Sequence, residues 1–316
     1  MLQKLSIRNF RLFEELDIEG FKRVNLIVGK NNTGKTTLLE AIRILEAKGH
    51  STVVNNILKS RGQFTPSWDE SYYALYPLKL ESYPSIVIND LIISLKTQDP
   101  RFKVVYPSEK IDAILSSSDS PDFPNDKLIN LPFTGYFNEF MQRSWDKISL
   151  TPLEDDVNDI IRKTIEPRLI RLDISGGAAK VRLEGINKPL PITVLGDGVQ
   201  RILLIALAFV SAKNDIDGQK GKIILIDEIE SGLHYSVQET LWKLIFEYAK
   251  KWDIQVFVTT HNQDTLNTFY YVANEPQNQG EGFLFRLQYS RKGKLEAIEY
   301  GQEHLKEVLE MNLEIR

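Results

Sequence analysis

The sequence has no cysteine and no apolar run long enough to cross a membrane. The missing cysteines exclude disulfide bonds and any metal or cluster site with thiolate ligands. The longest apolar run, residues 202–210, has nine residues, whereas a helix that spans a bilayer needs about 20. Residues 1–5 also lack the apolar core of a signal peptide. We therefore expect a cytoplasmic protein with no membrane partner.

The chain also lacks an excess of positive charge. Its net charge of −4 gives no overall attraction to nucleic acid, so any contact with DNA requires a local basic patch. The contents of 42% hydrophobic and 26% charged residues are typical of globular proteins. A length of 316 residues is sufficient for one large α/β domain with an insertion, or for two domains.

The most informative motif is Gly-Lys-Asn-Asn-Thr-Gly-Lys-Thr-Thr at residues 29–37, which fits the P-loop pattern. An apolar run at 24–28 precedes it and apolar residues at helical spacing follow it, as this strand–loop–helix motif requires. We expect Lys35 to neutralise the β- and γ-phosphates and Thr36 to place its hydroxyl on Mg²⁺. The glycines allow a tight loop, and the helix N-terminus attracts anions. The predicted nucleoside triphosphate site consists of Gly29, Lys30, Asn31, Asn32, Thr33, Gly34, Lys35, Thr36 and Thr37.

Regions with an α/β pattern surround a middle segment of different character. Between about 60 and 150, aromatic residues, prolines and short β-like runs replace long helical patterns. We therefore expect an α/β fold of the P-loop NTPase type, with a mixed or parallel sheet and flanking helices. Its head consists of residues 1–59 and 192–316, and residues 60–191 form an inserted lobe with approximate boundaries.

The head and the lobe each have specific predicted elements. In the head we expect paired strands at 2–11 and 16–18, a buried helix at 202–212, a buried strand at 222–226, an amphipathic helix at 235–252, a strand at 255–259, a hairpin at 283–300 and a short helix after it. In the lobe we expect a hairpin at 91–106, a surface loop at 116–126, a helix at 153–165 and a hairpin at 169–183.

Two carboxylates, Asp227 and Glu228, follow the apolar strand at 223–226. Strand ends in parallel sheets point toward the ligand crevice, so Asp227 is expected near the P-loop, where it can hold Mg²⁺ together with Thr36. Glu228 is then placed to orient the attacking water or to accept its proton. The alternative for an isolated pair of this kind is an acidic turn after a core strand.

His261 ends the next strand in Thr-Thr-His-Asn and can donate a hydrogen bond to a γ-phosphate. The remaining histidines, His50, His234 and His304, form no metal-ligand pattern. We assign no metal other than the Mg²⁺ of the nucleotide.

Gly-Asp-Gly-Val-Gln-Arg at 196–201 opens the buried helix. Glycines before a helix N-terminus form a second anion-binding position, although a loop with an Asp cap explains the same letters equally well. Together with the P-loop, the first interpretation suggests a composite site that another subunit completes.

This order of motifs, from Ile-Arg-Asn-Phe-Arg at 7–11 to Thr-Thr-His-Asn at 259–262, resembles the ABC-type ATPases of the RecF, SMC and overcoming-lysogenization-defect (OLD) group. It is most similar to the compact, standalone OLD-like AAA family ATPases of prokaryotes. The resemblance covers residues 1–48 and 192–270. It implies that residues 29–37 are the Walker A loop, that Asp227 and Glu228 are the Walker B pair, that residues 230–234 are the D-loop and that His261 is the switch histidine.

By the same resemblance, Lys35, Glu228 and His261 are the catalytic residues, and ATP and Mg²⁺ are the cofactors. The signature-like residues, which would contact ATP bound by another protomer, are Gly196, Asp197, Gly198, Gln200 and Arg201. Arg8 or Arg11 would reach the phosphates or the base. This sequence departs from the family pattern in lacking the signature serine and in having Asn262 where relatives often have serine, and only Gln63 is a candidate for the Q-loop glutamine.

The resemblance also sets the expected function. OLD nucleases continue after the switch histidine into a Toprim domain, and SMC proteins carry long heptad arms; neither pattern is present, so we do not expect nuclease activity or a coiled-coil arm. The leading hypothesis is a dimeric ATPase, head-to-tail or of higher order, that serves an anti-phage or anti-plasmid defence system with a separately encoded effector such as a Toprim-like nuclease. The alternative is a RecF-like, DNA-binding repair ATPase. A transporter subunit is disfavoured by the missing Ser-Gly-Gly-Gln signature, and a binding-only switch stays open.

Overall fold

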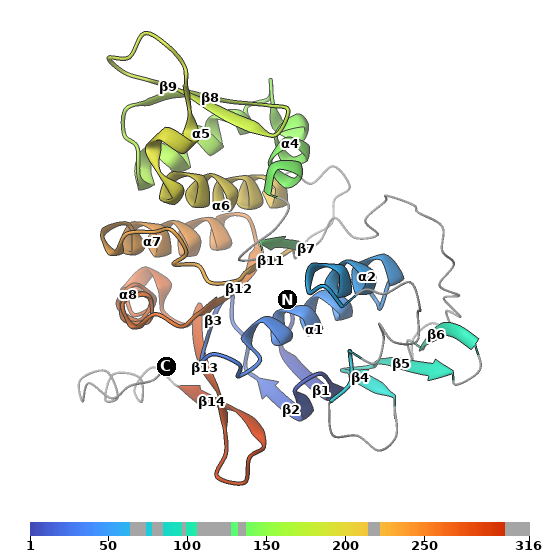
Figure 1. The fold of residues 1–316 in the computed structure, drawn as a ribbon. Helices are drawn as coiled ribbons and strands as arrows, with labels where there is room; N and C mark the ends of the chain where they lie inside the picture. The colour runs from blue at the N-terminus through green and yellow to red at the C-terminus, as the bar shows by residue number, and fades with distance from the viewer. Residues whose placement is uncertain are drawn as a thin grey trace.

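The computed structural model describes residues 1–63, 74–77, 85–96, 99–105, 128–131, 137–213 and 222–300. This part of the chain contains three β-sheets. Figure 1 shows α6 between α7 and a lobe that contains α4, α5 and the sheet of β8 and β9, with the other two sheets and α1 on the other side of α7. No helix of the described residues is long and apolar enough to cross a membrane.

The central sheet has six strands in the order β14-β13-β3-β12-β11-β7, and all neighbours are parallel except the pair β13 and β14. Every residue of β3, β11 and β12 is buried, which is expected for parallel strands covered on both faces. Their bounds are β3 Val24–Val28, β7 Leu128–Leu131, β11 Lys222–Ile226, β12 Ile254–Thr260, β13 Gly282–Tyr289 and β14 Leu295–Tyr300.

Alternate residues of these strands enter two separate hydrophobic cores. On one face, Leu26 and Ile224 belong to the core that includes α6; on the other, Ile27 and Leu225 belong to the core that includes α1. This division follows from the two-residue period of a strand. The helices of the first core are α4 Phe137–Ile148, α5 Leu153–Thr164, α6 Asp197–Lys213, α7 Tyr235–Lys251 and α8 Gln263–Ala273; those of the second are α1 Lys35–Glu46 and α2 Ser51–Ser60.

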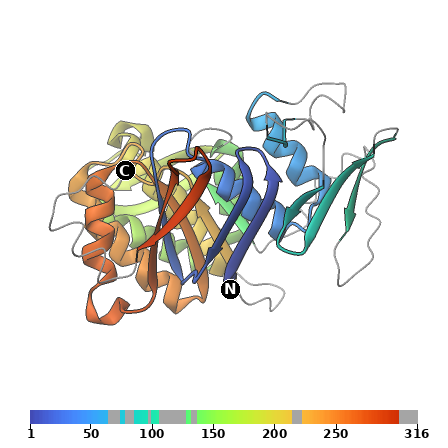
Figure 2. The same ribbon diagram turned by 90° about the horizontal axis from the view of Figure 1, so that it is seen from below.

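An antiparallel sheet with the strand order β2-β1-β4-β5-β6 packs beside α1. Figure 2 shows β5 and β6 at one end of the molecule. The strands of this antiparallel sheet are β1 Lys4–Phe10, β2 Phe13–Glu19, β4 Ile86–Ile88, β5 Leu91–Lys96 and β6 Asp99–Val105. A third sheet in the order β10-β9-β8 consists of β8 Leu169–Ser175, β9 Ala178–Leu183 and β10 Leu190–Pro191. The 3-10 helices are η1 Ile192–Leu195 and η2 Pro276–Asn278.

The structure contains most of the predicted elements, and the α/β fold class is confirmed. The hairpins β1–β2, β5–β6, β8–β9 and β13–β14 are all antiparallel, as expected. Three helices, α2, α4 and α8, were not predicted, and α4 lies where short β-like runs were expected. The expected loop at 116–126 and the expected short helix after 300 lie outside the described residues.

The division into head and lobe stays a prediction, but β7 bears on how its boundaries are drawn. This strand lies within the segment 60–191, yet it pairs with β11 in the central sheet. By contrast, α4 and β8 from the same segment pack against each other in the lobe of Figure 1.

Candidate nucleotide-hydrolysis site

The P-loop is packed so closely that both of its pattern glycines are required. A Cβ on Gly29 would lie 2.5 Å from the carbonyl oxygen of Leu287, and a Cβ on Gly34 would lie 2.8 Å from Cζ of Phe13. Both distances are shorter than real Cβ contacts, and Gly34 also has a φ of +89°, which is costly for other residues. The loop is therefore pressed between β13 and β2, and α1 begins directly after it at Lys35.

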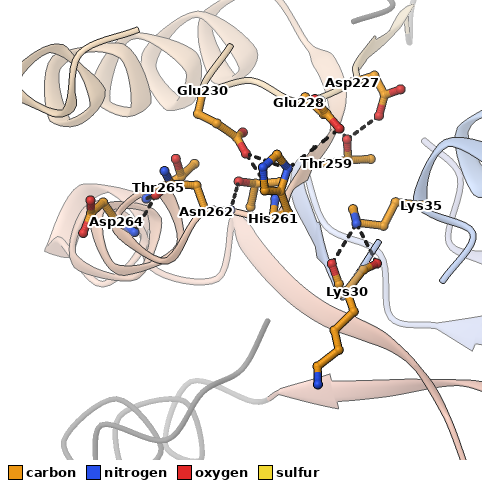
Figure 3. A network of polar contacts seen from close by, with 12 residues as sticks. Lys30, Lys35, Asp227, Glu228, Glu230, Thr259, His261, Asn262, Asp264 and Thr265 are labelled. Atoms are coloured by element: carbon orange, nitrogen blue, oxygen red, sulfur yellow. Dashed lines mark hydrogen bonds and ion pairs between the residues drawn. The ribbon is translucent and has the colours of Figure 1, made fainter. Parts of the chain in front are cut away.

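Lys35 points back into the loop (Figure 3). Its ammonium group donates hydrogen bonds to the carbonyl oxygens of Gly29 at 2.7 Å and Lys30 at 3.0 Å. Burial lowers the pKa of Lys35, and the carboxylates of Glu228, Asp227 and Glu230 oppose this effect. The N-cap of α1, Gly34, provides no side-chain hydrogen bond, so the first N–H groups of the helix keep the anion-binding character that a phosphate requires.

Thr36 and Asp227 meet across the gap between α1 and β11. The Thr36 hydroxyl donates to Oδ2 of Asp227 at 2.9 Å, and the buried Thr259 hydroxyl donates to Oδ1. A hydroxyl and a carboxylate are the oxygen donors that Mg²⁺ prefers, so the pair fits the predicted metal position. No group of three or more His, Asp or Glu side chains that could hold a metal occurs among the described residues. The remaining ligands of Mg²⁺ would therefore be oxygens of nucleotide and water, as is usual for this ion.

Glu228 has an unusual backbone that Thr259 stabilises. Its φ is +48°, a left-handed conformation that is uncommon for a residue other than glycine. Its N–H donates to the Thr259 hydroxyl at 2.8 Å, so this one hydroxyl bridges the backbone of Glu228 and the carboxylate of Asp227. Burial raises the pKa of Glu228; Asp227 and Glu230 add to the effect, whereas His261 and Lys35 oppose it. A carboxylate with a raised pKa is a better proton acceptor for water.

His261 lies between two carboxylates (Figure 3). Its Nδ1 is 3.4 Å from Oε1 of Glu230 and 3.7 Å from Oε1 of Glu228, and its backbone N–H donates to Oε1 of Glu230 at 3.1 Å. The Glu230 side chain is only 9% exposed, whereas the imidazole is 47% exposed. Glu230 therefore orients the histidine from the protein side and leaves the ring accessible to a ligand.

Asn262, which stands where relatives often have serine, has a structural role. Asn262 is the N-cap of α8, and its Oδ1 accepts hydrogen bonds from the N–H groups of Asp264 at 2.7 Å and Thr265 at 3.1 Å. Serine and asparagine are both strong N-cap residues, so either satisfies this position. The substitution is therefore no evidence against a functional His261.

The signature-like loop packs on the predicted D-loop of the same chain. A Cβ on Gly198 would lie 2.9 Å from the carbonyl oxygen of Gly232, which lies beside Asp197. Gly196 and Asp197 are exposed, and Gln200 is half-buried. Arg201 is different: it is only 5% exposed, and its Nη2 donates to the carbonyl oxygens of Asp227 and Glu228. The Arg201 side chain therefore points into its own chain, and its predicted contact with a nucleotide of another protomer stays a prediction.

The arginines near the first strand have carboxylate partners within the chain. Arg8 donates to both carboxylate oxygens of Asp17, at 3.0 and 2.8 Å, and this hydrogen bonding raises its pKa. Arg11 is buried, its Nε lies 3.0 Å from Oε2 of Glu40, and its Nη1 donates to Gln63 at 2.9 Å. Arg11 is thus buried and paired within its own chain, and the predicted nucleotide contacts of Arg8 and Arg11 stay predictions. Gln63, the Q-loop candidate, is half-buried and accepts the hydrogen bond from Arg11.

The roles of Thr259, Glu230 and Arg201 in supporting these groups were not predicted from the sequence. Each of them had a signal: Thr259 follows a run of apolar strand residues, Glu230 follows the Walker B pair, and Arg201 directly precedes a long apolar run. Hydroxyl and carboxylate groups at the ends of parallel strands are candidates for a site at that edge. Tyr289 of β13 was also missed; its hydroxyl donates to the carbonyl oxygen of Asn32 in the P-loop.

Comparisons with known proteins agree with this geometry. Residues 1–143 match the family model described as "AAA ATPase domain", and residues 137–267 match "AAA domain, putative AbiEii toxin, Type IV TA system". An SMC head bound to the C-winged helix domain of ScpA has a TM-score of 0.60 at 16% identity, covering 96% of this chain and 99% of that one. The chain is an ATPase with the fold of the ABC type. An SMC head of Pyrococcus furiosus also shares its fold, with a TM-score of 0.55 at 13% identity over 98% of each chain.

Relatives of this ATPase are found at two levels of coverage. The "ATP/GTP phosphatase" of Helicobacter pylori is 24% identical over 369 aligned positions, which include 96% of each chain. The "DNA replication and repair protein RecF" of Bacillus cytotoxicus is 34% identical over 96 residues, but this match spans only 30% of the ATPase and 24% of RecF. The similarity to RecF is therefore local, whereas that to the phosphatase covers nearly the whole chain.

Proposed function

We propose that this ATPase hydrolyses Mg²⁺-ATP at the site formed by the P-loop and the ends of β11 and β12, and that it works as a dimer. One observation carries the proposal: a connected polar network lies at the carboxyl ends of adjacent parallel strands. Its members are Thr36, Asp227, Thr259, Glu228 and His261. This edge is where open α/β sheets bind their ligands.

Each group in the network has a chemical task. Lys35 and the first N–H groups of α1 bind the phosphates. Thr36 and Asp227 hold Mg²⁺, which neutralises charge on the phosphate oxygens when it is bound. Glu228 orients a water molecule for attack and accepts its proton, for which its raised pKa is suited. His261, oriented by Glu230, donates a hydrogen bond to the γ-phosphate.

The exposed position of the signature-like loop supports the dimer. Gly196 and Asp197 are exposed at the start of the 17-residue helix α6, whose N-terminus favours an anion. Gly198 packs on Gly232, so this loop and the D-loop present one continuous surface. A second copy that places its ATP on this surface would complete the phosphate contacts of that nucleotide. Size-exclusion chromatography with light scattering should then show a dimer with ATP and a smaller species without it.

Glu228→Gln tests the hydrolytic role, because it removes the proton acceptor and keeps the shape of the side chain. We expect it to bind ATP, to retain ATP-dependent dimerisation and to lose multiple turnover. Glu247→Gln, an exposed position on α7, is the matched control and should behave as the wild type. Retained turnover in Glu228→Gln would show that Glu228 does not have the proposed role.

As its biological role, the ATPase would be the sensor or motor of a prokaryotic defence system with a separately encoded effector, plausibly a Toprim-like nuclease. The match of residues 137–267 to a model named for a toxin of a Type IV TA system supports such a role. Cells that carry the native locus should restrict phage or plasmids, and those with Glu228→Gln should not. Equal restriction by both would separate the defence phenotype from ATP hydrolysis, and no restriction by either would refute the role.

The local similarity to RecF favours one alternative, a DNA-binding ATPase in repair. In that case, duplex DNA should stimulate ATP hydrolysis, and binding should weaken steeply as the salt concentration rises. The net charge of −4 argues modestly against it. Measuring ATP turnover with and without DNA at two salt concentrations distinguishes the alternatives.

A further inference from the structure

Arg201 connects two parts of the site that lie far apart in sequence. It lies one turn after the start of α6, and its side chain is almost completely buried. Its Nη2 donates to the carbonyl oxygen of Asp227 at 2.6 Å and to that of Glu228 at 3.2 Å. These carbonyl groups belong to the turn at residues 227–228, which we call the Walker B turn and which directs the Walker B carboxylates toward the P-loop. Arg201 therefore binds the backbone of the Walker B turn.

This turn needs partners because its conformation is unfavourable in itself. Glu228 has a φ of +48°, a left-handed backbone conformation that is unfavourable for a residue other than glycine. Thr259 stabilises the turn from the β12 side through the N–H of Glu228, and its backbone carbonyl accepts the N–H of Ile229. Arg201 stabilises it from the α6 side through the carbonyl groups. The direction of the Glu228 carboxylate thus depends on the position of α6 relative to β12.

The same helix begins at the signature-like loop. Gly198 lies three residues before Arg201 and packs on the carbonyl group of Gly232. We propose that Arg201 is a positioning residue that couples the signature-like loop to the orientation of Glu228. A rigid first turn of α6 transmits displacement of the loop, on contact with another copy, to the Walker B turn. This inference rests on the proposed hydrolysis of ATP by a dimer.

A simpler role for Arg201 would be to balance buried negative charge. Burial lowers its pKa, and the carboxylates of Asp227, Glu230 and Glu228 oppose the effect, so the guanidinium is close to all three. Charge balance alone requires only a cation, which lysine supplies. Holding two successive carbonyl groups requires the fixed donor geometry of a guanidinium, which lysine lacks. Arg201→Lys therefore separates the roles, and Arg201→Met removes both.

The experiment measures nucleotide affinity and chemistry separately in the full chain. The dissociation constant is measured by fluorescence titration with a fluorescent ATP analogue and Mg²⁺, and the rate of hydrolysis is measured in a single turnover with excess enzyme. We expect Arg201→Lys to change the dissociation constant less than about threefold and to lower the rate about 10-fold or more, the loss that misplaced catalytic groups cause. Arg201→Met should lose more.

Arg23→Met is the matched control. Arg23 is 16% exposed and pairs with Asp253 and Glu281, so its loss tests the general effect of removing a partly buried arginine. It should lower the melting temperature without changing the single-turnover rate of the folded protein. If Arg201→Met does not fold, Arg201→Lys still decides the question because it keeps the charge.

The possible outcomes are distinct. Wild-type rate in Arg201→Lys, or equal losses of affinity and rate, would overturn the positioning role while leaving the proposed function intact. A wild-type chain that binds but does not hydrolyse ATP would overturn the proposed function and this inference with it. The coupling is tested further by Gly198→Ala, whose Cβ would displace the loop. Its effect on the rate should be non-additive with that of Arg201→Lys, and additive losses would refute the path through α6.

Discussion

Replacing Thr259 with valine should damage both the stability and the activity of this ATPase, because one hydroxyl serves two functional groups. Thr259 is completely buried in β12. Its hydroxyl accepts the N–H of Glu228 at 2.8 Å and donates to Oδ1 of Asp227. Valine has nearly the same shape, so Thr259→Val removes these hydrogen bonds without creating a cavity.

The size of the effect follows from the two bonds. Losing a hydrogen bond to a charged group costs about 1.5–3 kcal/mol, and leaving a buried N–H unpaired costs about 1–3 kcal/mol. Asp227 keeps its hydrogen bond from Thr36, so the loss at this carboxylate is only partial. We therefore expect a destabilisation near the lower end, about 2–3 kcal/mol. Hydrolysis should fall by roughly 10- to 100-fold, because the carboxylates lose their fixed positions.

Thermal unfolding and initial rates of phosphate release measure these two effects. Thr259→Ser is the matched control, because it keeps the hydroxyl and loses only a methyl group, and it should retain most of the activity. At about 2–4 °C per kcal/mol for domains of 150–250 residues, the valine variant should melt roughly 5–10 °C below the wild type. A valine variant that matches the serine variant in melting temperature and turnover would refute the bridging role of this hydroxyl.

Other predictions concern the P-loop, the catalytic carboxylate and a helix cap. Gly34→Ala places a Cβ 2.8 Å from the Phe13 ring at a φ of +89°. It should therefore destabilise the fold by about 2–4 kcal/mol in urea unfolding and weaken ATP binding in a titration. Phe13→Leu, combined with it, should restore part of the stability and part of the affinity. Burial raises the pKa of Glu228, so its charged form destabilises the folded chain as the pH rises through that pKa. Glu228→Gln should therefore raise the melting temperature at about pH 8 and not at about pH 4, where the protonated Glu228 of the wild type is neutral like glutamine. An equal rise in melting temperature at both pH values would contradict the raised pKa. Asn262→Ala should destabilise the chain by about 1 kcal/mol, whereas Asn262→Ser should melt close to the wild type. Equal losses of stability in the alanine and serine variants would exclude a capping role for this side chain.

Much of the fold could be predicted from the sequence because its strands have strong local signals. The five residues of β11 are apolar or bury an aliphatic stem, and the run ends in two carboxylates, which together indicate a covered parallel strand at a site. The helices α4 and α8 were missed for a local reason: their apolar residues are interrupted by polar ones, and aromatic residues in α4 resemble a strand pattern. Strand β7 was missed because it has only four residues, and its partner β11 lies more than 90 residues later in the chain.

The orientation of the arginines shows where reasoning from motifs ends. A motif assigns Arg11 and Arg201 to a nucleotide by their position in the chain, but both side chains are buried and bind groups of their own chain. One signal in the sequence pointed in this direction. Arg201 directly precedes an apolar run of nine residues in a helix that is buried all round, and an arginine there must find a buried partner because desolvating an unpaired charge is costly. Carbonyl groups at the end of an adjacent strand can accept hydrogen bonds from such a guanidinium, as those of Asp227 and Glu228 do. Arg201, in the first turns of the most apolar helix, therefore marks the contact between α6 and the Walker B turn. This contact is the one that Arg201→Lys breaks.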